Sequence, residues 1–357
     1  MPAGGRGYNG GMRALTYHGP FDVRVTDEPD PGLFDDEAAV VQVLACGICG
    51  SDLHIYEGHG FSPELGYCVG HEAVGEVVEV GAAVRQFRVG DEVLVSASTG
   101  CNACGPCRAG YVLGCERNRS GCYGLGPFLP GSQAEYVAVP CADGNLVARP
   151  EGLSDAAAIV LTDNAPTAWY GARRARIRPG DTVAVVGLGP VGMMAVQSAF
   201  VLGAGRVLGI DLVPERRAAA AALGAEPVDG DPKVVVRELT RGRGADAVIE
   251  AVGADAPIDL AMKIAARGAR ISIVGVTQNP AFPTHLQLAQ FNELEIALGL
   301  CSVQRELPAL LALTAAGRLR PEAVVTHELP LSDGADAYAR FHAREDGVGK
   351  VVLDPSR

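Results

Sequence analysis

Apolar residues follow two different patterns along the chain, and the pattern changes near residue 180. In the first half they form short runs, separated by glycine and polar turns, at residues 12–17, 38–45, 74–81, 91–95 and 133–139. Short strands at such close spacing predict a small, barrel-like β domain. One helix is expected to begin after Ser154, because a serine hydroxyl caps the free backbone N–H groups of a first helical turn.

From residue 182 onward, continuous apolar strands alternate with helical segments. We expect strands at 182–186, 206–210, 245–250, 270–275 and 295–300, with helices at 193–202 and 258–267. Such alternation predicts an α/β fold with a doubly wound parallel sheet. A last helix over 307–316 leads to strands near Val324 and Val351, and these indicate a return to the first domain.

Length and charge limit the possible function classes. A chain of 357 residues predicts two domains rather than one core. Its net charge of -12 argues against a nucleic-acid footprint, which needs a basic face. No apolar run reaches the ~18 residues that span a bilayer, and the glycine-rich start, residues 1–11, lacks the apolar segment of a signal peptide. We expect residues 1–11 to be a mobile extension and the protein to be cytoplasmic.

The strand at 182–186 runs directly into the glycine-rich segment 187–192, Gly-Leu-Gly-Pro-Val-Gly, which opens a helix. In the dinucleotide-binding fingerprint, Gly187 makes the tight turn, Gly189 lets the backbone approach the pyrophosphate and Gly192 lets the helix pack on the sheet. The pyrophosphate sits at the positive N-terminus of the helix. A glycine turn without a ligand is the alternative.

Asp211, at the end of the next strand, indicates which cofactor binds. A carboxylate there accepts hydrogen bonds from the adenosine ribose and repels a 2′-phosphate, which favours NAD over NADP. Arg216 and Arg217 lie close by and could weaken that preference. The expected NAD-binding residues also include Arg216, Thr167, Pro190, Val191 and Val276.

Four cysteines within fifteen residues, Cys101, Cys104, Cys107 and Cys115, predict a closed tetrahedral zinc site. The two Cys-x-x-Cys steps allow backbone amides to point at the sulfurs. A closed site has no position for a substrate, so its expected role is structural. Four unrelated thiols, or redox pairs, are the alternatives.

A second cluster combines thiol, imidazole and carboxylate groups. Cys46 and Cys49 precede Asp52 in one segment, and His71-Glu72 follows some twenty residues later, in a region that is expected to form strands and tight turns. These groups are zinc ligands, and a catalytic zinc keeps one coordination position open for water or substrate. Spacing alone does not choose between Cys46 and Cys49.

Together, the three motifs resemble those of the zinc-containing medium-chain alcohol dehydrogenases, over essentially everything after Met12. The stretches 130–137 and 161–167 are most similar to the formaldehyde-dehydrogenase-like branch. The resemblance implies a GroES-like, β-rich catalytic domain formed by 12–165 and 307–357. A Rossmann domain, 166–306, is inserted between these two parts.

The resemblance also implies the roles of individual residues. Cys49 and His71 are zinc ligands, and Asp163 falls at the position of a third ligand. Glu72 is the acid beside the site, able to coordinate in some states, and Asp52 orients the zinc-bound histidine. Two zinc ions per chain are therefore expected, one catalytic and one structural.

The implied reaction transfers a hydride between a small alcohol or aldehyde and NAD, with zinc polarising the substrate oxygen. A proton leaves through Ser51, the nicotinamide ribose and His54. Without this role, Ser51 would be a turn-capping serine and His54 a surface histidine.

The sequence is also compatible with other functions. The substrate could be a polyol or a biosynthetic secondary alcohol, or the enzyme could be an aldehyde dismutase that retains its NAD. A non-catalytic relative is disfavoured, because Cys49, His71 and Asp163 are all present. A homo-oligomer, dimer or tetramer, is expected by resemblance, with no nucleic-acid or membrane partner.

Overall fold

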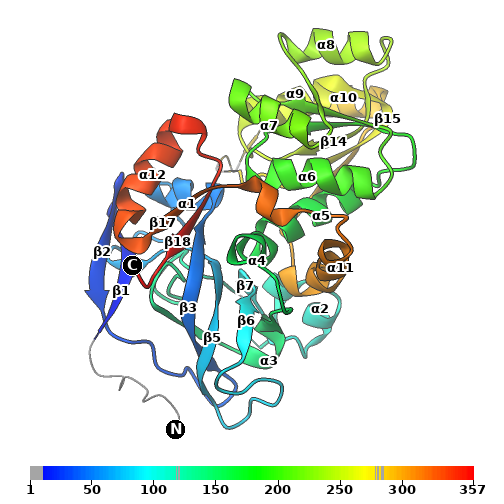
Figure 1. Ribbon diagram of the computed structural model, residues 1–357. Helices are drawn as coiled ribbons and strands as arrows, with labels where there is room; N and C mark the ends of the chain where they lie inside the picture. Colours follow the sequence, from blue (N-terminus) through cyan, green and yellow to red (C-terminus); the bar gives the residue numbers. More distant parts are fainter. Residues whose placement is uncertain (1–10, 118, 120, 278, 280, 283–284) are drawn as a thin grey trace. The chain divides into compact units, whose positions relative to one another are not determined.

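The computed structural model describes residues 11–117, 119, 121–277, 279, 281–282 and 285–357 (Figure 1). The expected mobile extension, residues 1–11, lies outside the described residues except for Gly11. The chain forms two compact units. The first comprises the residues up to Asp163 together with 302–305 and 325–357, and the second comprises 164–301 and 306–324.

The first unit is built on a seven-stranded sheet with the order β10-β6-β5-β3-β18-β17, in which β9 also pairs with β3. A three-stranded sheet, β2-β1-β4, and the pair β7-β8 complete it. The strands are β1 Met12–Gly19, β2 Asp22–Glu28, β3 Ala39–Ile48, β4 Tyr67–Cys68, β5 Glu72–Val80, β6 Glu92–Val95, β7 Ser98–Thr99, β8 Gly121–Cys122, β9 Tyr136–Val139, β10 Leu146–Ala148, β17 Val325–Pro330 and β18 Lys350–Asp354.

The long strand β3 organises this unit. Its first half pairs with β9 and its last residues, 46–48, pair with β18, near the end of the chain. Along its whole length it also pairs with β5. Valines and alanines fill β3, and they are buried because neighbouring strands and helix α4 cover them. The chain therefore returns at β18 to the strand that leads into Cys49.

Short helices connect these strands. They are α1 Gly50–Tyr56, α2 Gly105–Arg108, α3 Ala142–Asn145, α4 Asp155–Thr162 and α12 Gly334–Ala343, with 3₁₀ turns at η1 Val112–Gly114, η3 Leu331–Asp333 and η4 Glu345–Gly347. The expected helix after Ser154 is confirmed, and the Ser154 hydroxyl accepts the N–H of Ala157 at 3.2 Å. The expectation of strands and tight turns after Cys49 was wrong at α1. Asp52 at the third position of this helix accepts the N–H of Cys49 (2.9 Å) and so caps it.

The second unit confirms the doubly wound parallel sheet, with the order β13-β12-β11-β14-β15-β16. All five neighbouring pairs are parallel, and all five residues of the central strand β11 are buried. The elements are β11 Thr182–Val186, β12 Arg206–Ile210, β13 Glu226–Pro227, β14 Ala245–Glu250, β15 Ala265–Ile273, β16 Glu295–Leu298, α5 Asn164–Arg174, α6 Pro190–Val201, α7 Pro214–Ala222, α8 Pro232–Leu239, α9 Asp255–Ile264, α10 Leu286–Phe291, α11 Val303–Ala315 and η2 Pro321–Val324.

The boundary of the second unit differs from the expected one at 306–324. Most of α11 and the turn η2 belong to the second unit, whereas the sequence placed residues from 307 onward in the first. Two contacts account for the difference. Arg173 of α5 pairs with Glu306 at 2.6 Å, and the Gln197 side chain of α6 accepts the N–H of Arg320 at 2.8 Å.

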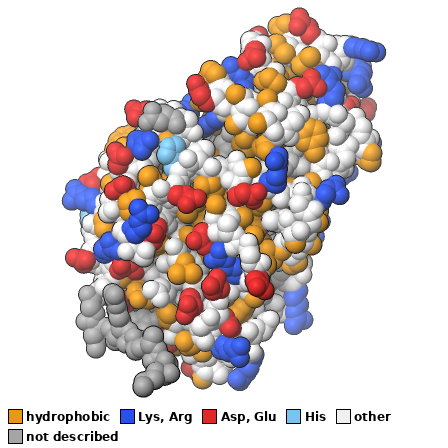
Figure 2. All heavy atoms as spheres, viewed as in Figure 1, with side chains coloured by type: hydrophobic (Ala, Val, Ile, Leu, Met, Phe, Trp, Pro, Cys, Tyr) orange, Lys and Arg blue, Asp and Glu red, His pale blue; other side chains and the backbone are white. Residues whose placement is uncertain are grey.

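The visible surface carries mixed charge. Figure 2 shows Lys and Arg side chains dispersed among Asp and Glu on this face, without a continuous basic patch. Within the described residues, no helix is both long enough and apolar enough to cross a membrane.

Candidate metal centres and cofactor site

Four side chains of the first unit converge on one point. One ligand atom from each of Cys49, His71, Glu72 and Asp163 lies within 4.8 Å of the others. The Cys49 Sγ is 3.4 Å from Oδ2 of Asp163, and the same oxygen is 3.6 Å from Nε2 of His71. Cys49 follows β3, His71 directly precedes β5, Glu72 begins β5, and Asp163 directly follows α4. The sheet and one helix thus bring together residues far apart in sequence.

Gly70 makes the approach of His71 possible. Its φ of +87° is in the left-handed region, which favours glycine. A Cβ at this position would lie 2.3 Å from the Gln133 side chain. Any other residue would therefore displace Gln133, which itself belongs to the network behind the histidine.

Asp52 lies directly behind His71. Its Oδ1 is 3.1 Å from Nδ1 of His71, and its Oδ2 accepts the N–H of Cys49. Since Nδ1 faces the carboxylate, Nε2 is the nitrogen that faces Cys49 and Asp163. This is the arrangement in which a carboxylate fixes the tautomer of a metal-binding histidine.

Two residues of this network were not predicted from the sequence. Gln133 donates from Nε2 to Oδ2 of Asp52 (3.3 Å) and to the carbonyl of Gly47 (2.8 Å), and its Oε1 accepts the hydroxyl of Tyr338 (2.9 Å). Both side chains are buried. They lie 205 residues apart, so no local pattern could reveal the contact.

The electrostatics of this cluster suit a divalent cation. Burial and the nearby charge of Asp163 raise the pKa of the Cys49 thiol. Burial alone would lower the pKa of His71, but the carboxylate of Asp52 and other anionic groups raise it well above its ordinary value. For Asp163, burial is outweighed by the His71 contact, and its pKa falls. A zinc ion would supply the positive charge that this group of acids and thiol requires.

Glu72 forms a second, fully buried contact. Its carboxylate pairs with the ammonium group of Lys350, and neither side chain is exposed to solvent. Burial raises the pKa of Glu72 although the lysine opposes that shift. Lys350 was not among the predicted site residues. The signal for it was a single lysine at the start of an otherwise apolar strand, Lys-Val-Val-Leu.

The remaining predicted residues of this centre lie nearby. The Ser51 hydroxyl is 3.3 Å from Nε2 of His71, and His54 lies one turn later on the same helix, α1. Cys46 is fully buried, with its Sγ 3.8 Å from the carbonyl of Leu353, and is outside the cluster. Of the two cysteines that spacing left open, the structure therefore brings Cys49 to the ligand set.

Residues 101–115 form a lobe that contains the second potential metal group. Its members are four cysteines whose sulfurs lie within 4.8 Å of one another, Cys101, Cys104, Cys107 and Cys115. The Cys101 and Cys107 sulfurs are 4.0 Å apart, near the ~3.8 Å that tetrahedral Zn–S bonds of about 2.3 Å require. The N–H groups of Cys101 and Cys104 point at sulfurs, each at 3.4 Å. Burial would raise the pKa of Cys115, but backbone N–H groups, led by that of Cys101, lower it to about 6.

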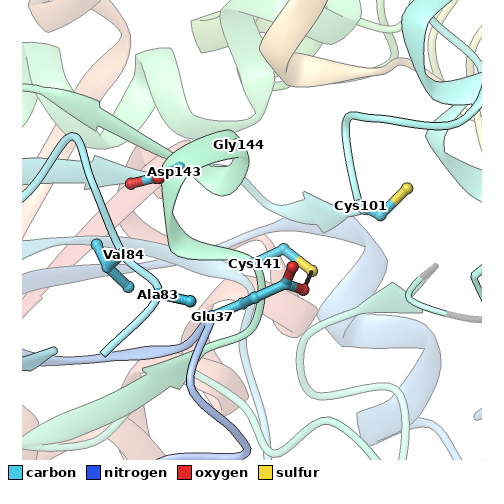
Figure 3. Close-up of a pocket in the computed structure, with 7 residues that line it drawn as sticks. All are labelled: Glu37, Ala83, Val84, Cys101, Cys141, Asp143 and Gly144. Atoms are coloured by element: carbon cyan, nitrogen blue, oxygen red, sulfur yellow. Dashed lines mark hydrogen bonds between the residues drawn. The ribbon is translucent and has the colours of Figure 1, made fainter. Parts of the chain in front are cut away.

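A pocket adjoins this lobe, and Figure 3 shows the side chains that line it. Cys141 points toward Glu37, with the sulfur 3.7 Å from Oε2, while Cys101 lies on a separate loop. Burial raises the pKa of the Cys141 thiol to about 11, so the thiol stays protonated near neutral pH. Cys141 is therefore a packing residue beside the lobe, outside both metal groups.

The glycine-rich loop of the second unit has the expected geometry at each glycine. Gly187 has a φ of +90°. A Cβ at Gly192 would lie 1.8 Å from the carbonyl oxygen of Gly187, so the helix could not pack so closely with any other residue. A Cβ at Gly189 would meet nothing within 4 Å, which leaves space for a ligand beside the backbone. Pro190 and Val191 begin α6, whose N-terminus faces this space.

Asp211 lies beside this loop. Its Oδ2 accepts the N–H of Leu188 at 2.7 Å, and its Oδ1 accepts the N–H of Val213 at 2.9 Å. A guanidinium nitrogen of Arg216 is 4.0 Å from Oδ2, and Arg217 donates to the Asp211 carbonyl. Thr167 lies on α5 and is half-buried, and the backbone of Val276 packs against Gly253.

Comparisons with known proteins agree with both units. Residues 35–151 match the family described as "Alcohol dehydrogenase GroES-like domain", and residues 190–316 match "Zinc-binding dehydrogenase". A probable zinc-binding alcohol dehydrogenase of Mycobacterium tuberculosis is 41% identical over 96% of this chain and 89% of its own length. A sorbitol dehydrogenase of Bacillus subtilis is 30% identical, over 97% and 98% of the two chains.

Solved structures show the same architecture. The alcohol dehydrogenase TADH from Thermus sp. ATN1 has a TM-score of 0.89 and 41% identity, covering 96% of this chain and 99% of that one. Because 96% of the chain is covered, this similarity extends over both units.

Proposed function

Since this chain belongs to the zinc-type alcohol dehydrogenase family, we propose that it interconverts small alcohols and aldehydes at a zinc held by Cys49, His71 and Asp163. The enzyme is an NAD-dependent oxidoreductase of this family. The observation that carries the site assignment is the convergence of thiolate, imidazole and carboxylate ligand atoms within 4.8 Å. The four lobe cysteines hold the second, structural zinc.

Each residue of the centre has a defined task in this proposal. Zinc bound there supplies Lewis-acid chemistry, polarising the substrate oxygen, and NAD supplies the hydride acceptor. Asp52 fixes the ring of His71 through Nδ1, at 3.1 Å, so that Nε2 is free to bind the metal. Ser51, whose hydroxyl is 3.3 Å from that nitrogen, would accept the proton that the substrate alcohol releases, and His54, one turn later on α1, would pass a proton on to solvent.

We assign NAD binding to Asp211 and the glycine-rich loop, with Arg216, Thr167 and Val276 as further contact residues. A carboxylate that faces the adenosine ribose favours NAD. We propose a homo-oligomer, as the resemblance implies.

The substrate class has two candidates. The stretch 161–167 supports the formaldehyde-dehydrogenase-like branch and hence a small aldehyde or primary alcohol. The similarity to a sorbitol dehydrogenase over 97% of this chain supports a polyol or secondary alcohol instead. Initial rates with NAD on ethanol, 1-butanol, sorbitol and 2,3-butanediol separate these two. A dismutase would convert an aldehyde without added NAD.

The variant Asp163→Ala tests the ligand assignment. We expect zinc content to fall from two ions per chain to one, because the catalytic site loses a ligand while the lobe keeps all four cysteines. Elemental analysis measures this directly. The matched control is Asp155→Ala, an exposed acid at the other end of α4 that pairs with Arg149. Two zinc ions in Asp163→Ala would refute the assignment.

A further inference from the structure

The pair formed by Lys350 and Glu72 is unusual in its burial. Both side chains are completely inaccessible to solvent. The Lys350 ammonium also donates to the carbonyl of Ile48 at 3.1 Å. Lysine is almost never fully buried unless it is paired. Here its partner is the one acid of the metal cluster that the proposed ligand set leaves out.

The two side chains meet across strand β3. Glu72 of β5 and Val352 of β18 pair with Gly47 from opposite sides. A Cβ on Gly47 would lie 1.9 Å from Oε2 of Glu72 and 2.9 Å from Nζ of Lys350. The absence of a side chain at this one position therefore lets the lysine reach the carboxylate over the middle strand.

The Glu72 carboxylate is within reach of two cations. One of its oxygens lies within 4.8 Å of the ligand atoms of Cys49, His71 and Asp163. Its Oε2 contacts the ammonium of Lys350. Carboxylates are good zinc ligands, and a fourth protein ligand would close the position that a catalytic zinc keeps for substrate. Metal and lysine therefore compete for the same carboxylate.

We propose that Lys350 is a positioning residue that holds the Glu72 carboxylate away from the catalytic zinc and so keeps the fourth coordination position open. The proposal rests on the assignment of Cys49, His71 and Asp163 as the zinc ligands. Removal of the ammonium leaves Glu72 as a buried anion whose nearest cation is the metal, and the carboxylate then binds it. The lysine acts on the metal only through Glu72.

The variant Lys350→Met tests this with cobalt(II) exchanged into the catalytic site. In the wild-type enzyme, added imidazole should occupy the open position and shift the visible d–d bands of cobalt. In Lys350→Met the bands should be shifted already and should not respond to imidazole. A chelator should extract zinc from Lys350→Met roughly tenfold more slowly than from the wild-type enzyme. Substitution of residues that contact metal ligands changes metal affinity on this scale. Adding Glu72→Gln to the variant should restore both properties.

A purely structural role for Lys350 gives the opposite result. The variant would then lose zinc faster than the wild-type enzyme, and its cobalt bands would still respond to imidazole. Adding Glu72→Gln would not slow the loss of zinc. These results would overturn the proposal. Arg270→Met is the matched control, since it breaks another largely buried ion pair, with Asp181, in the second unit. If Lys350→Met does not fold, Lys350→Gln carries the same test, because it removes the charge and keeps an N–H donor.

The experiment also separates this proposal from the site assignment. A wild-type enzyme that takes up no cobalt beyond the four-cysteine lobe contradicts the ligand set itself. Uptake at both sites with unchanged imidazole binding in Lys350→Met contradicts only the role of the lysine.

Discussion

At the scale of single residues, Asp211 carries two tasks. Its carboxylate accepts the N–H groups of Leu188, inside the glycine-rich loop, and of Val213, just beyond β12. It therefore fixes the shape of the loop as well as facing the expected ribose. Each hydrogen bond to a charged group contributes about 1.5–3 kcal/mol. Loss of this carboxylate should affect both the loop and the cofactor.

We expect Asp211→Ala to weaken NAD binding by roughly 10- to 100-fold, because about 1.4–2.7 kcal/mol is the contribution of one such hydrogen bond. The preference for NAD over NADP should fall, because no anion then repels the 2′-phosphate. Fluorescence titration with NADH and NADPH measures both effects. The control is Asp229→Ala, an exposed acid that pairs with Arg217. Unchanged cofactor preference in Asp211→Ala would contradict its assignment.

At the scale of structural elements, the four-cysteine lobe has a very small buried core. Its helices are α2, of four residues, and the 3₁₀ turn η1, of three. Val112 is the one non-cysteine residue in its buried cluster. Segments with so small a core depend on metal for their folding free energy.

Cys115→Ser should therefore release the lobe zinc and unfold the lobe locally. We expect limited proteolysis to cut within residues 101–122 of this variant while the wild-type chain stays intact there, because local unfolding exposes the backbone. Zinc content should fall by one ion. Cys301→Ser is the control, since Cys301 belongs to neither metal group. Equal protease resistance in the two variants would mean that the lobe folds without metal.

The sequence predicted those elements whose signals are local. The segment 182–192 and the Cys-x-x-Cys steps combine periodicity, glycine and ligand spacing within a few residues, and the structure has the predicted strand and helix. Helix α1 was missed because Gly50, Ser51 and Asp52 have low helix propensity, and capping by Asp52 decides its start. The partner of Glu72 lies 278 residues away, beyond any local pattern.

At the scale of the whole molecule, metal binding, proton binding and folding are linked. In the proposed catalytic site, zinc would bind the thiolate of Cys49 and a neutral imidazole of His71, so bound protons would have to leave both groups. The pKa values of both groups are raised, that of His71 well above its ordinary value. Protons therefore compete with zinc more strongly as the pH falls, and the stabilisation that zinc gives the folded chain must decrease with it.

We expect the melting temperature difference between zinc-loaded and chelator-treated enzyme to be larger at pH 8 than at pH 6. While a group is protonated in the metal-free enzyme, each proton that zinc displaces from it changes the binding free energy of zinc by about 1.4 kcal/mol per pH unit. The melting temperature difference should therefore change by several degrees between pH 6 and pH 8. Calorimetric scans at pH 6, 7 and 8 measure it. The variant Asp163→Ala should keep only the lobe zinc. Its melting temperature difference should therefore lack the pH dependence that Cys49 and His71 contribute in the wild-type enzyme. A wild-type difference independent of pH, or an Asp163→Ala variant with the wild-type dependence, would show that these two residues do not bind zinc.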